Sequence, residues 1–173
     1  MIIEERPLSP VLQSELDAHL RDGLRTIGCP SSAIGPDKIA DQLLEFLVEF
    51  EKAKSQFNER QVEALLVQLG AVLASVFIEK YGWTWTCAKD ESEKDFYFVV
   101  SRDKKMMLQP WTFLQDCVQQ PEPHHAVRNL IALPEIAALS DEVMNTDLLY
   151  QDIGMAFMAM GALAALSQDQ ENN

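Results

Sequence analysis

The fold is decided by residues 62–89, which read VEALLVQLGAVLASVFIEKYGWTWTCAK. Up to residue 81, apolar side chains recur every three or four positions and fill more than one face of a helix, which is typical of a central helix. Gly82 is expected to end this helix, because glycine readily adopts a left-handed C-cap. Apolar residues then alternate at Trp83, Trp85 and Cys87, which predicts a half-buried strand. A central helix therefore leads directly into a sheet.

Helices are predicted on the N-terminal side of this stretch. The first begins at Ser9-Pro10, a cap residue followed by proline at the first helical position, and it ends at Gly28. The second begins at Gly35, which again precedes a proline. Asn58 and Gln61 have the spacing of a capping box, so they mark the start of the central helix.

Short strands and further helices are predicted after the central helix. Residues 96–100 and 105–109 read as strands, and the connections are short enough only for an antiparallel meander. Residues 111–118 form a short helix, 119–125 a loop, and 126–133 a short segment that Pro134 interrupts. A last helix is expected over residues 146–167.

The fold class is therefore α+β, with N-terminal helices, a three-stranded antiparallel meander and C-terminal helices. We expect a single α+β domain over residues 1–173. Its parts are a helical region at 9–81, the β-meander at 83–110, a second helical region at 111–167 and a disordered tail at 168–173.

The charge of the chain restricts its partners. Fourteen basic and 27 acidic side chains give a net charge of −13. Residues 121–173 hold much of this excess, and no Lys or Arg follows Arg128. Such a charge repels nucleic-acid phosphates and anionic lipid, so neither a nucleic acid nor a membrane is expected as partner. The acidic surface is either a solvated face or a docking surface for a basic protein.

Cysteine usage and the N-terminus indicate the compartment. Three cysteines at wide spacing contain no CxxC pair, which suits a reducing environment. The first residues have neither the basic nor the apolar region of a signal peptide, and no uncharged apolar run reaches the length of a membrane span. We therefore expect a cytoplasmic protein.

Candidate catalytic and metal-binding residues are few. His124 and His125, with Glu122 and Cys117, could hold a metal ion, but adjacent histidines diverge and a surface loop is the simpler interpretation. Cys87 is expected to be a core residue, whereas Cys29 is the cysteine expected to be exposed. A group of carboxylates reads as a solvated helix start; its members are Asp141, Glu142, Asp147 and Asp152. We assign no catalytic residue, metal or cofactor.

The aromatic and C-terminal residues are better candidates for binding. Trp83, Trp85, Trp111 and Phe113 surround the meander and serve either as core or as a groove for a partner or ligand. Residues 153–166 carry no charge, so a helix formed by them is expected to be buried. It is buried against its own domain, a second copy of the chain or a partner protein. The candidate partner-binding residues are Ile153, Met155, Phe157, Met158, Met160 and Trp111.

The central stretch also resembles a known family. LGAVLA at residues 69–74 and YGWTW at 81–85 resemble a bacterial domain family of unknown function. Its members have an LGxxLG-type helix followed by a Gly-x-Trp strand and a β-meander. The resemblance covers residues 62–118, and Ala74 stands where the pattern has its second glycine. It implies the same order of elements and supplies no catalytic residue.

These observations favour a non-enzymatic, acidic bacterial protein that binds another protein. Immunity proteins for secreted toxins and secretion chaperones have similar size and charge, which is an analogy rather than a motif. The alternative is a small-ligand-binding protein or enzyme that uses the aromatic face of the meander. A homodimer through the C-terminal helix is also expected.

Overall fold

A computed structural model describes residues 5–29, 34–89, 95–139 and 151–155. Its helices are α1 (Pro10–Thr26), α2 (Pro36–Ala53), the short 3-10 helix η2 (Lys54–Gln56), α3 (Glu59–Tyr81), α4 (Pro110–Cys117) and α5 (Pro123–Leu139). Its strands are β1 (Thr84–Lys89), β2 (Asp95–Val100), β3 (Met106–Leu108) and β4 (Gln151–Asp152). The predicted α+β architecture is confirmed: helices, a three-stranded antiparallel sheet, then helices.

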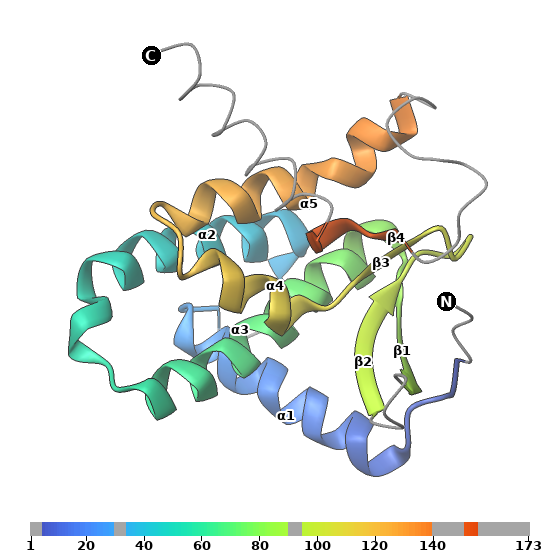
Figure 1. Cartoon of the computed structure of the whole chain (residues 1–173), viewed down its shortest axis with the longest axis horizontal. Helices are drawn as coiled ribbons and strands as arrows, with labels where there is room; N and C mark the ends of the chain where they lie inside the picture. The colour runs from blue at the N-terminus through green and yellow to red at the C-terminus, as the bar shows by residue number, and fades with distance from the viewer. Residues whose placement is uncertain (1–4, 30–33, 90–94, 140–150, 156–173) are drawn as a thin grey trace, which may run out of the picture.

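Helix α3 is the centre of the molecule, as predicted. It packs against α1, α2 and α4, and in Figure 1 it runs between α1 on one side and α2 with α5 on the other. Every residue from 69 to 77 is buried. By length and composition α3 is able to cross a membrane, but its burial is that of the core helix of a soluble protein. Its predicted ends are confirmed, since Asn58 caps it within a capping box and Gly82 closes it with a φ of 68°.

The helical stripe that runs directly into the first strand predicts that these residues are buried together: Leu66, Leu69, Val72, Leu73, Val76, Phe77, Trp83, Trp85, Phe98 and Leu108. This prediction is confirmed with two differences. The main cluster contains the α3 stripe, Trp83 and Leu108, but Trp85 is only partly buried beside it. Phe98 belongs to a second cluster with Ala88, Val100 and Met107. The reason is the pleat of β2, because neighbouring residues point to opposite faces and Val99 already faces the helices.

The sheet has one strand more than predicted. Strands β1, β2 and β3 are antiparallel neighbours, with Thr86 opposite Phe98 and Val100 opposite Met107. The two-residue β4 then pairs in parallel with β3. The helix predicted over 146–167 is therefore wrong at Gln151 and Asp152, and the helical residues begin at Ile153. A strand of two residues is too short to show the alternation of apolar and polar side chains by which strands are predicted. Residues 146–150 and those after 155, with the predicted tail, lie outside the described residues.

The loop predicted at 119–125 and the break predicted at Pro134 are also wrong in part. Helix α5 begins at Pro123, so His124 and His125 lie in its first turn, and the helix continues through Pro134. Proline suits the first helical position. Inside the helix it removes one backbone hydrogen bond, at a cost of about 3 kcal/mol. The burial of Val127 and Leu130 in the main core offsets that loss.

Candidate functional site

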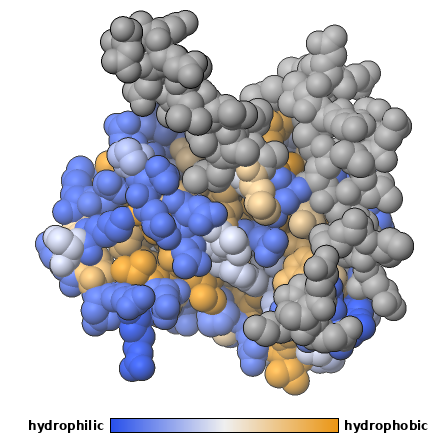
Figure 2. Space-filling view, viewed as in Figure 1, coloured by the Kyte–Doolittle hydropathy of each residue, from blue (hydrophilic) through white to orange (hydrophobic). Residues whose placement is uncertain are grey.

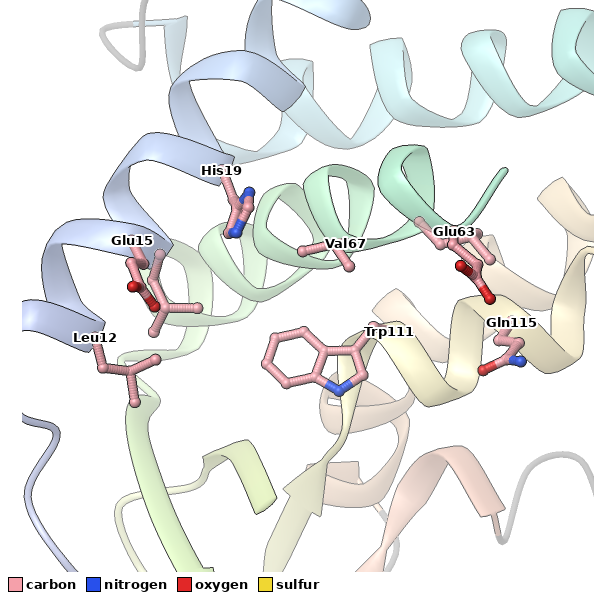
Figure 3. Close-up of a pocket in the computed structure, with 9 residues that line it drawn as sticks. Leu12, Glu15, His19, Glu63, Val67, Trp111 and Gln115 are labelled. Atoms are coloured by element: carbon pink, nitrogen blue, oxygen red, sulfur yellow. The ribbon is translucent and has the colours of Figure 1, made fainter. Parts of the chain in front are cut away.

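An apolar groove lies between α1, α3 and α4. It has a volume of about 300 Å³ and is lined by Leu12, Glu15, Leu16, His19, Glu63, Leu66, Val67, Trp111 and Gln115. In Figure 3 the indole of Trp111 lies in the middle of the groove, beneath Val67. Glu15 of α1 lies on one side of the indole and Glu63 of α3 on the other. The groove therefore has an apolar floor and two carboxylates along its rim.

Two glycines hold the walls of this groove close to α3. A Cβ atom at Gly23 of α1 would lie 2.6 Å from the carbonyl oxygen of Gln68 and 2.6 Å from Cγ2 of Val72. A Cβ atom at Gly70 of α3 would lie 3.1 Å from the backbone nitrogen of Trp111. Since real Cβ contacts are longer, both helices approach α3 only because these positions lack a side chain. The glycines therefore set the width of the groove.

Trp111 is held in place by other aromatic rings. Its ring stacks on that of Trp85 with a centroid distance of 5.5 Å and an interplanar angle of 22°. The ring of Tyr97 approaches edge-on at 6.3 Å. Trp111 thus covers one side of Trp85, while Trp85 also lines a separate hollow against α1 and α3. What remains exposed of the Trp111 indole borders the groove.

A second hollow continues the groove along α3. Its volume is about 310 Å³, and it shares Glu63, Leu66 and Gln115 with the first. The remaining lining residues are Lys54, Phe57, Glu59, Val62, Val118 and Gln119. Phe57 is 38% exposed, which is unusual for a phenylalanine. Figure 2 shows hydrophobic atoms between hydrophilic ones on this side of the molecule. Together the two hollows form one elongated trough.

The charge of the trough is negative at the Trp111 end. Glu15 and Glu63 have no hydrogen bond or ion pair within the described part of the chain, and no Lys or Arg lines the first hollow. In the second hollow, the ammonium of Lys54 donates a hydrogen bond to the carbonyl of Val118. Lys54 keeps its positive charge in this bond and partly offsets Glu59 and Glu63 in the second hollow, whereas no Lys or Arg lining the first hollow offsets Glu15 and Glu63.

The structure does not bring the residues predicted to bind a partner together on one surface. Trp111 lines the groove, whereas Ile153 is fully buried in the main core and Met155 is 68% exposed. Phe157, Met158 and Met160 lie outside the described residues. A Cβ atom at Gly154 would lie 3.1 Å from a ring carbon of Phe113, so packing within the chain explains this glycine.

The metal site considered at residues 117–125 is not assembled. Nε2 of His125 lies 3.9 Å from Oε2 of Glu122, and both side chains are exposed. The ring of His124 contacts that of His125. No group of three or more His, Cys, Asp or Glu side chains with metal-binding geometry occurs within the described ranges.

The cysteines are all buried, so the exposure predicted for Cys29 is wrong: it is 1% exposed. Burial raises the pKa of Cys117 to about 12, with a smaller contribution from Asp116. Burial, followed by Asp95, also raises the pKa of Cys87. Both thiols are thus held in the protonated, unreactive form.

The other shifted groups lie outside the trough as well. Burial is the main cause of the raised pKa of Tyr97 and of Asp152, although Asp152 accepts hydrogen bonds from the N–H groups of Gly154 and Met155. A hydrogen bond from Ser101 lowers the pKa of Asp103 in the β2–β3 turn. None of these groups lines the trough.

Sequence reasoning found Trp111 but missed the trough. The sequence feature that pointed to it is a glutamate next to apolar residues at helical spacing. Glu15 lies three residues after Leu12, and Glu63 lies three and four residues before Leu66 and Val67. Helix periodicity shows which residues share a face, but it does not show that α1 and α4 leave part of α3 uncovered.

Comparison with known proteins adds no relative. No family model, no curated protein and no solved structure matches this chain. The function is therefore argued from the trough.

Proposed function

We propose that this protein binds a segment of another protein in the trough between α1, α3 and α4, without catalysing a reaction. The observation that carries the proposal is the combination of an apolar floor with two carboxylates, Glu15 and Glu63, that have no ion pair with any residue the structure describes. A basic partner complements that charge, in agreement with the net charge of −13. A cytoplasmic role as an immunity-like or chaperone-like protein suits such chemistry.

The elongated shape favours a peptide segment over a small metabolite. The α3 residues that line the two hollows run from Glu59 to Val67, about 12 Å along the helix axis. That length matches about two turns of an amphipathic helix, which binds grooves through apolar anchors on one face. A compact metabolite would fill one hollow and leave the other empty.

An NMR titration with a designed peptide tests this proposal. The probe is a helical peptide with leucines on one face and lysines on the other, and its twin carries glutamates in place of the lysines. We expect the basic peptide to shift resonances of α1, α3 and α4 and the acidic twin to have no effect. Val67→Asp should abolish the shifts.

The matched control is Val48→Asp on α2, because Val48 is half-buried like Val67 but lines neither hollow. It should leave binding unchanged. Equal shifts with both peptides, or perturbations confined to other helices, would overturn the proposal. Circular dichroism of each variant separates a lost site from a lost fold.

We also propose that residues 155–166 contact a second copy of the chain, since Ile153 and Gly154 pack within their own chain. The support is the absence of any charge in this stretch, together with the 68% exposure of Met155. Because both copies are acidic, added salt should strengthen the dimer. Sedimentation at two salt concentrations tests this, and a monomer at both would overturn it.

A further inference from the structure

We infer that the Trp111 end of the trough is a slot for one Lys or Arg side chain of the partner segment, and that the far end takes an apolar side chain. The inference rests on the proposed function and names the chemistry that the site recognises. It rests on the difference between the two hollows: Trp111 and Glu15 line only the first, Phe57 and Val62 line only the second, and Glu63 lines both.

The indole of Trp111 is a fixed surface for a cation. Gly70 brings the backbone of Trp111 close to α3, and Trp85 and Tyr97 pack against the ring. Its orientation is therefore set before a partner arrives, and little entropy is lost on binding. A cation within about 6 Å of an indole centroid is attracted by the negative face of the ring.

The carboxylates select a cation over other groups. In Figure 3, Glu15 and Glu63 lie on opposite sides of the Trp111 indole. An anionic side chain would be repelled from both sides, and a neutral one would leave both charges uncompensated. A Lys or Arg side chain instead lays its apolar stem along Leu12 and Val67 and places its charge between the carboxylates.

The far hollow is more apolar and less negative than the Trp111 end. Phe57, Val62 and Val118 provide apolar surface there. Glu59 and Glu63 also line it, but the ammonium of Lys54 offsets one of their charges, so a second cation is attracted less strongly than at the Trp111 end. The trough therefore selects its partner segment by polarity as well as by shape. The segment needs a basic residue at one end and an apolar residue about two helical turns away.

The test compares two helical peptides that differ at a single position. One carries Lys at the position that faces Trp111, and the other carries norleucine, which keeps the stem and removes the charge. Isothermal titration calorimetry should show about a tenfold weaker affinity for the norleucine peptide. Glu15→Gln and Glu63→Gln should weaken binding of the Lys peptide and leave the norleucine peptide unchanged.

Glu45→Gln is the control, since it removes the same charge from an exposed position of α2 outside the trough. If it weakens binding as much as Glu63→Gln, the attraction is nonspecific and the slot is overturned. If both peptides bind equally and Val67→Asp abolishes both, the slot is overturned while the proposed function stands. If neither peptide binds, both are overturned.

Discussion

Replacing Gly23 by alanine tests whether close packing sets the width of the trough. Gly→Ala in a helix interior normally stabilises a protein by about 1 kcal/mol, so α1 by itself predicts a gain. The structure predicts a loss, because the new Cβ would lie 2.6 Å from both the Gln68 carbonyl oxygen and Cγ2 of Val72. Overpacking of this kind costs about 1–3 kcal/mol. With contacts this short the upper end applies, which leaves a net loss of about 2 kcal/mol.

Urea denaturation followed by circular dichroism measures this difference. Gly70→Ala is the graded comparison, since its shortest contact is 3.1 Å and a smaller loss is expected. Comparing Ser14→Gly with Ser14→Ala, at an exposed position of the same helix as Gly23, reports the propensity difference between glycine and alanine alone. A Gly23→Ala variant that is more stable than the wild type would refute the argument that α1 is held against α3 by the missing side chain.

Three further results are expected. Leu73→Ala should lower the free energy of unfolding by roughly 2–5 kcal/mol in urea melts, because Leu73 is fully buried. Stability should fall as the pH rises through the raised pKa of Asp152, since the folded chain binds that proton more tightly than the unfolded chain. Asp152→Asn should flatten this part of the pH profile of thermal melts. Finally, Cys29, Cys87 and Cys117 should resist iodoacetamide in the native protein and react in urea, as measured by mass spectrometry.

The parts of the fold that were predictable are those with strong local signals. The Asn58 capping box, the Gly82 stop and the change from helix to strand each depend on neighbours in sequence, and the structure confirms all three. The alternating burial expected along the strand is wrong, since Thr86 is buried together with Cys87. The reason is a distant contact, because the backbone of Arg6 pairs with Cys87 and accepts a hydrogen bond from Thr86. Strand β4 and the continuation of α5 through Pro134 depend on contacts with distant residues. Local propensity argues against both, and tertiary packing overrides it.

The same distinction applies to the candidate site. Trp111 could be singled out because large aromatic residues often anchor binding interfaces. Its neighbours Glu15 and Glu63 could not, because they lie 48 residues apart in sequence and are ordinary charged positions on amphipathic helices. Only the packing of α1 and α4 against α3 brings them to one groove.

The trough and the core both arise because α3 is apolar on more than one face. From residue 69 to 77 its neighbours cover it completely, and that half is core. Towards its N-terminus Val62, Leu65 and Val67 stay only partly buried. Because α4 has only eight residues, it cannot extend far enough to cover this half as well. The apolar surface that α4 leaves uncovered, with Glu15 and Glu63 beside it, is the surface on which the proposed binding of a basic, apolar segment depends.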